Sequence, residues 1–151
     1  MEPLVFVGRD MFGHPGPTAL VTGLVMADSE SETRAALALL ETCPVLRKAV
    51  MREVNIVTEL DDLLQGGDQL LYPPGAHCAT DNMWTSASVN ALLPGVHKIV
   101  ETMPPAPAHM LWMLWGPTEP RPDMAFSLES DLYLALYGIS MDEAGESACQ
   151  A

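Results

Sequence analysis

The run of residues 131–139, DLYLALYGI, constrains the fold most, because any strand it forms has apolar side chains on both faces. Successive side chains of a strand point to opposite faces, so its three leucines point one way and Tyr133 and Tyr137 the other. Neither face can be left bare in water without leaving a large apolar patch. We therefore expect helices on the leucine side and a further covering object on the tyrosine side.

A second run, Ala108–Trp115 (AHMLWMLW), repeats this property and predicts the neighbouring strand. Alternation divides its side chains into two sets, Met110, Trp112 and Leu114 on one side and His109, Leu111, Met113 and Trp115 on the other. Both sets are too apolar to face solvent. Two interpretations stay open: a self-made dimer or stacked lid with tryptophans filling volume, or a surface for a flat ligand or second domain.

The remaining patterns predict two more strands and two long helices. Residues 18–26 and 77–85 are expected to be strands. A helix is expected from Ser29, with Glu32 completing a capping box, to Cys43-Pro44, and another over Ser88–Met103, where Pro94 marks a kink or a start. The order of elements predicts an α+β fold, a mostly antiparallel sheet with the helices on one face and a ferredoxin-like β-α-β rhythm.

The weaker signals lie at the ends of the chain and in the middle. Residues 1–17, rich in Gly and Pro, are expected to be an irregular lead-in with at most a short strand, and residues 140–151 a flexible acidic tail. A single domain is then expected over 18–139. Residues 45–57 suggest extended structure, and a short helix from Thr58 is expected to stop at Gly66-Gly67.

Charge and composition exclude several classes of function. Seven Lys and Arg against twenty Asp and Glu give a net charge of −13, which removes the basic surface that nucleic acids and acidic membranes require. The longest apolar stretch, Ala19–Ala27, is too short to span a membrane, and no secretory signal is evident. Three scattered cysteines predict reduced thiols and a cytoplasmic protein. His77, Cys78 and Asp81 lack the spacing of a metal site.

Short runs spread along the chain carry a resemblance to one protein family. They are Ala27–Ser29, Thr42–Pro44, Ala79–Thr85, Leu92–Pro94, Pro104–Pro107, His109–Pro117 and Arg121–Glu129, followed by Tyr133 and Tyr137. In this order they resemble the substrate-binding domain of FAD-linked oxidases, the relatives of berberine bridge enzyme and the hydroxynicotine oxidases. None of the runs is a catalytic signature, so the catalytic residues stay unassigned.

The resemblance implies a sheet laid over the isoalloxazine ring of FAD, with its helix-free face lining the substrate cavity. In such oxidases the flavin takes a hydride from an alcohol, amine or sugar-type small molecule, while the protein supplies placement and electrostatics. Family members hold FAD in a separate Gly-rich domain, and this chain has no GxGxxG run or equivalent. We therefore expect a fragment that is inactive alone and that pairs with a flavin-binding domain or with itself through the open face.

Five residues follow as candidates for binding a substrate. Tyr133 and Tyr137 are expected to hydrogen-bond it, Trp112 and Trp84 to form an apolar wall beside the flavin, and His109 to serve as the acid–base candidate. For each of them the alternative is plain core packing. The rival function is a stand-alone ferredoxin-like module that binds a small ligand or dimerises.

Overall fold

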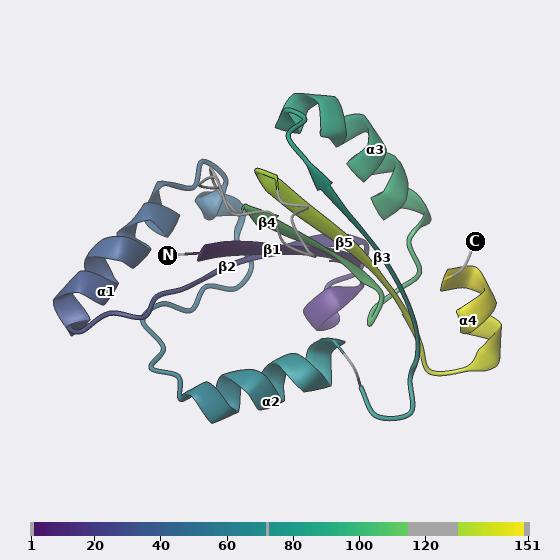
Figure 1. Cartoon of the computed structure of the whole chain (residues 1–151), viewed down its shortest axis with the longest axis horizontal. Coiled ribbons are helices and arrows are strands. Elements are labelled where there is room, and N and C mark those ends of the chain that lie inside the picture. Colours follow the sequence, from purple (N-terminus) through teal and green to yellow (C-terminus); the bar gives the residue numbers. More distant parts are fainter. Residues whose placement is uncertain (1, 72, 115–129, 150–151) are drawn as a thin grey trace, which may run out of the picture.

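The structure, a computed structural model, describes residues 2–71, 73–114 and 130–149 (Figure 1). Its elements, in chain order, are β1 (Glu2–Arg9), the 3₁₀ turn η1 (Met11–Gly13), β2 (Pro17–Leu24), α1 (Glu30–Leu37), η2 (Ala38–Thr42), η3 (Leu46–Lys48), α2 (Leu60–Leu71), β3 (His77–Thr85), α3 (Val89–Thr102), β4 (His109–Leu114), β5 (Leu132–Ser140) and α4 (Glu143–Cys149). Residues 121–129, one of the runs that carry the family resemblance, lie outside the described residues.

The strands form one five-stranded sheet in the order β2-β1-β4-β5-β3, and every neighbouring pair is antiparallel. The predicted α+β class with an antiparallel sheet is therefore confirmed. Strands β3 and β4 both run antiparallel to β5, which lies between them, and α3 connects them. This β3-α3-β4 crossover, completed by β5, is the predicted ferredoxin-like rhythm.

Strand register assigns each side chain to one of two faces. The tyrosine face carries Leu4, Phe6 and Gly8 of β1, His109, Leu111 and Met113 of β4, Tyr133, Ala135 and Tyr137 of β5, and Cys78, Thr80, Asn82 and Trp84 of β3. The leucine face carries Met110, Trp112 and Leu114 of β4 with Leu132, Leu134 and Leu136 of β5. Both sets agree with the alternation predicted from the sequence.

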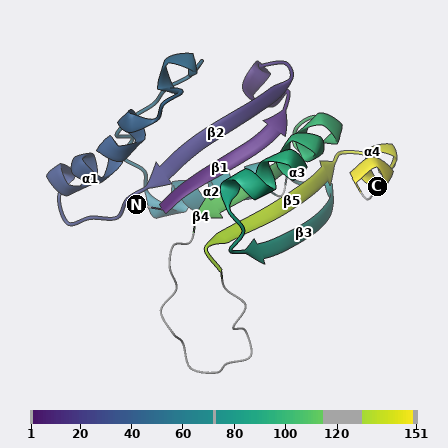
Figure 2. The ribbon, with the colours of Figure 1, turned by 90° about the horizontal axis from the view of Figure 1, so that it is seen from above.

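Helix α3 covers the leucine face, as predicted. In Figure 1 α3 lies on one side of the sheet and the purple turn η1 on the other, and Figure 2 shows α3 crossing over β4 and β5. Met11 of η1 packs with Phe6, Leu111 and Ala135, which places η1 on the tyrosine face and α3 on the opposite one. Burial of Met110 to 1% exposure is consistent with this cover.

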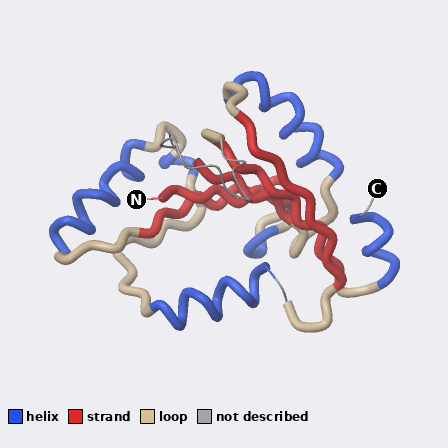
Figure 3. Tube along the Cα trace, in the orientation of Figure 1, coloured by secondary structure: helices blue, strands red, loops and turns tan. Residues whose placement is uncertain are grey.

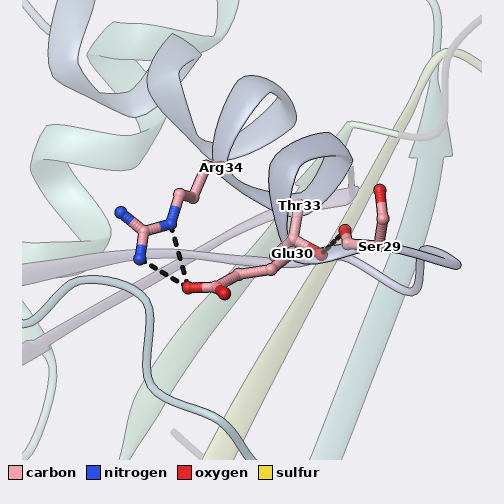
Figure 4. Close-up of polar contacts among 4 residues, drawn as sticks. All are labelled: Ser29, Glu30, Thr33 and Arg34. Carbon is pink, nitrogen blue, oxygen red and sulfur yellow. Dashed lines mark hydrogen bonds and ion pairs between the residues drawn. The ribbon is translucent and has the colours of Figure 1, made fainter.

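Helix α1 begins where the capping signal predicts but does not cover the sheet. Ser29 caps the helix by accepting a hydrogen bond from the amide of Glu32 at 3.3 Å. Arg34 reaches back to Glu30 one turn earlier, and Thr33 donates to the Ser29 carbonyl (Figure 4). Figures 1 and 2 place α1 beyond the β2 edge, and none of its residues is buried. The expectation that both long helices back the sheet is thus wrong for the first.

The lead-in predicted over residues 1–17 is ordered. Its first part is β1, paired on both sides within the sheet, and its Gly- and Pro-rich part is the connection to β2. The amide of Asp10 donates to the Gly16 carbonyl at 2.9 Å, and the amide of Gly16 donates to the Asp10 carboxylate at 2.7 Å. Gly13 and Gly16 have φ values of 77° and 81°, which glycine adopts without a steric cost. The glycines therefore build a tight turn.

The tail predicted over 140–151 contains α4, which packs against β5 and β3. Ser140 and Asp142 organise its start, because the Asp142 carboxylate accepts from the Gly145 amide at 2.7 Å and the Ser140 hydroxyl accepts from the Asp142 amide at 3.1 Å. His77 of β3 lies 3.0 Å from Glu146. Acidic composition predicted disorder here, but these local caps and the docking on β3 give a helix.

Residues 45–64 form neither a strand nor part of the sheet. After η3 they run as a loop, tan in Figure 3, into α2, which lies on the opposite side of the sheet from α3. The helix predicted to stop at Gly66-Gly67 continues to Leu71, because glycine lowers helix propensity by about 1 kcal/mol but keeps its amide donor. Pro94 likewise lies inside α3 and does not start it.

Candidate functional site

The tyrosine face carries two aromatic groups at opposite ends of β5. At one end the rings of Trp84 and Tyr133 lie 5.0 Å apart at 55°. At the other end His109 stacks on Tyr137 at 4.9 Å and 18°, and Phe6 lies 5.8 Å from the same imidazole. Trp84 and both tyrosines are half-buried, so part of each ring meets solvent. The face can therefore receive a flat apolar ring by stacking.

His109 is the buried polar group of this face, only 1% exposed. Its Nδ1 lies 2.8 Å from the carbonyl oxygen of Pro107, so Nδ1 carries the proton and donates. Burial lowers the pKa of His109 below 6.5, while the hydrogen bond to Pro107 opposes this shift. The ring is therefore neutral at pH 7, and its Nε2 is a buried acceptor without a hydrogen-bond partner in the described part of the chain.

Four of the five candidate residues share this face, and Trp112 does not. Trp112 pairs with Leu134 and Val5, on the side that α3 covers. The expected wall of Trp112 and Trp84 is therefore not formed, because the two residues lie on opposite faces of the sheet. Alternation had already put Trp112 and His109 on opposite sides of their strand, so both could not face one substrate. Trp115, which the alternation places with His109, lies outside the described residues.

Cations are absent from the described strand positions of the tyrosine face. Arg9 points to the other face and donates to the Glu101 carbonyl at 2.8 Å, and Asp81 also lies on the leucine side. The described cations elsewhere are on α1, α3 and the segment after η2. An apolar ring system fits such a surface, whereas a pyrophosphate, which requires cations or clustered amides, does not.

Two residues of this face escaped the prediction of site residues. Phe6 and Met11 belong to the lead-in, yet they form the core of the face with Leu111 and Ala135. A Cβ on Gly8 would lie 2.5 Å from the Met11 sulfur, so glycine permits Met11 to fold across β1. The alternation of Leu4 and Phe6 in the sequence was the signal that could have indicated a strand with Phe6 on its apolar side.

Other features of the described residues give weaker evidence for a functional site than the tyrosine face does. Among residues 2–71, 73–114 and 130–149, no three His, Cys, Asp or Glu side chains are arranged to hold a metal ion. His77 and Cys78 point to opposite faces of β3. An open depression of about 590 Å³ is lined by residues 25–28, Glu32 and Ala36, away from the aromatic groups. No helix in the described parts of the chain is long and apolar enough to cross a membrane.

Comparison with known proteins adds no relative: the chain matches no family model, no curated protein and no solved structure. The class defined by fold and face is therefore an α+β domain with one helix-covered and one aromatic sheet face.

Proposed function

We propose that this chain is the substrate-binding portion of an FAD-dependent oxidoreductase that acts on an alcohol, amine or sugar-type small molecule. The observation that supports it best is the tyrosine face, opposite α3, on which Trp84, Tyr133 and Tyr137 are half-buried beside an apolar core. The resemblance of short runs along the sequence to FAD-linked oxidases agrees with this arrangement. A cytoplasmic location is proposed with it, supported by the free thiols of Cys43 and Cys78.

In this proposal the residues of this chain line the substrate cavity and orient the substrate in it. A bound flavin supplies the hydride acceptor, and the absence of cations from the described tyrosine face supports a second domain as the holder of its phosphates. The phenols of Tyr133 and Tyr137 both donate and accept hydrogen bonds, so they suit a substrate hydroxyl or amine. His109, sealed below the surface, positions the ring of Tyr137 by stacking. Trp112 has no part in this site.

The test is binding of the flavin ring alone. Lumiflavin, which lacks the phosphates, and FAD are each titrated with the chain while flavin fluorescence is followed. We expect weak binding of both ligands with similar affinity. Trp84→Ala and Tyr137→Ala should weaken binding about three- to tenfold, the range of one aromatic stacking contact. Trp112→Ala, on the covered face, is the matched control and should leave binding unchanged.

Four results would contradict the proposal. FAD binding far more tightly than lumiflavin would mean that this chain recognises the phosphates itself. No binding of lumiflavin, or equal effects of Trp84→Ala and Trp112→Ala, would mean that the tyrosine face does not receive the ring. Self-association that Tyr137→Ala abolishes, without any affinity for lumiflavin, would favour the rival module that dimerises through its sheet.

A further inference from the structure

A second surface lies outside the sheet, in the residues from Val45 to Leu64, here termed the pairing segment. Its large apolar side chains are strongly exposed: Val50 at 71%, Ile56 at 62%, Val57 at 92% and Leu60 at 59%. Several large apolar side chains exposed within one segment are typical of a surface that another molecule covers.

The pairing segment carries opposite charges at its two ends. Arg47 and Lys48 are exposed at its start, and Asp61 and Asp62 are exposed in the first turn of α2 near its end. Within the described residues, none of these four side chains makes an ion pair, whereas Arg52 between them pairs with Glu41. The segment thus presents cations at its start and anions near its end, and the exposed apolar side chains lie between them together with Arg52, Glu53 and Glu59.

The exposed area is large for a chain of this mass. The chain exposes 10743 Å², whereas a compact monomer of 16.3 kDa exposes about 7,500 Å². A standard protein interface needs about 800 Å² from each partner. The difference from a compact monomer is larger than this area, but it is summed over the whole chain, of which the pairing segment is one part.

We infer that the pairing segment is the interface of a homodimer, in which it packs antiparallel against the same segment of a second copy. A two-fold axis brings each residue i against j and each j against i, so an antiparallel pair places Arg47 and Lys48 of each copy opposite Asp61 and Asp62 of the other. The segment also holds three of the seven Lys and Arg in a chain of net charge −13. With its four Asp and Glu the segment has a net charge of 3 − 4 = −1, so two copies of it repel each other only weakly.

Charge-reversal variants test two points together: that the partner is a second copy of this chain, and that the two segments run antiparallel. Sedimentation velocity on the full chain should give a dimer of twice 16.3 kDa. R47E/K48E and D61K/D62K should each weaken self-association at least about tenfold, because every change acts twice across the axis. An equal mixture of the two variants should restore dimers, since both contacts become attractive again. D61K/D62K reduces the net charge from −13 to −9, so net charge alone predicts the opposite effect.

A substitution at an exposed apolar residue of the pairing segment distinguishes an interface there from an interface on the tyrosine face. Val57→Asp should make the chain monomeric at micromolar concentration, while Val89→Asp, at a 46% exposed position on α3, should stay dimeric. Circular dichroism checks that both variants keep their helices. Lumiflavin binding should be unchanged by Val57→Asp, so failure here and failure of the proposed function are distinguishable. A monomeric wild type, unaffected charge variants, or no dimer in the mixture would each overturn the inference.

Discussion

Lowering the pH below neutrality should destabilise the fold through His109. The ring is buried between Phe6 and Tyr137, and the group that it hydrogen-bonds is the neutral carbonyl of Pro107. No carboxylate is among these contacts to compensate a positive charge. Protonation of Nε2 would place a cation in an apolar site with no acceptor for its second N–H.

The sign follows from the lowered pKa of His109 in the folded state. Below pH 6.5 the unfolded chain binds a proton at this residue, while the folded chain does not until the lower, folded pKa is reached. The contribution of neutral His109 to the free energy of unfolding is therefore fully present above pH 6.5. It decreases as the pH falls from 6.5 toward the lower pKa of the folded state. The slope is at most about 1.4 kcal/mol per pH unit for one group, or about 3–5 °C in melting temperature.

Two variants isolate this effect in thermal melts between pH 7.5 and 5. His109→Asn keeps a donor near the Pro107 carbonyl and His109→Phe keeps the stacked ring, and neither titrates in this range. Both variants should be less stable than the wild type at pH 7.5. Below pH 6.5 their melting temperatures should not show the decrease with falling pH that the wild type shows. His97→Asn, at an exposed position of α3, should keep the slope. If His109→Asn and His109→Phe retain the wild-type slope, the buried imidazole is not its source.

Three glycine substitutions give further predictions, each measured as a shift in the urea unfolding midpoint. Gly8→Ala should destabilise by about 1–3 kcal/mol, because its Cβ would meet the Met11 side chain and the Ala108 carbonyl. Gly95→Ala, inside α3 with nothing within 4 Å of the new Cβ, should instead stabilise by about 0.5–1 kcal/mol. Gly145→Ala should lower the midpoint, because its Cβ would collide with the Ser140 side chain at the start of α4.

Strand alternation predicted the sheet well because a period of two is imposed by the backbone itself. The run from Leu132 to Tyr137 was enough to assign both faces of β5, and the structure has the two tyrosines and the leucines on opposite sides. Helix starts with a local cap were equally predictable, as at Ser29. These signals depend on neighbours within a few positions, which the sequence contains directly.

The errors concern contacts between distant parts of the chain. Nothing near Glu2–Arg9 indicates that this stretch pairs with β4, more than a hundred residues later. Composition predicted a flexible tail at α4, but the helix depends on contacts with β3 and β5. The position of α1 beyond the β2 edge is also a tertiary result, since its capping signal fixes where the helix begins and not what it packs against.

The difference between local signals and long-range contacts also explains why the candidate site was only partly predicted. Alternation placed Tyr133 and Tyr137 on one surface, whereas Trp84 and His109 were grouped with them through the resemblance, and the register of β3 and β4 on β5 puts both there. The burial of His109 needed Phe6 from β1, and β1 reaches it only through long-range pairing. A residue's face is therefore a local property, whereas its access to solvent and its protonation state are tertiary ones. This is why His109 changes from a candidate acid–base group into a neutral residue that positions Tyr137, leaving the partly exposed rings to contact any ligand.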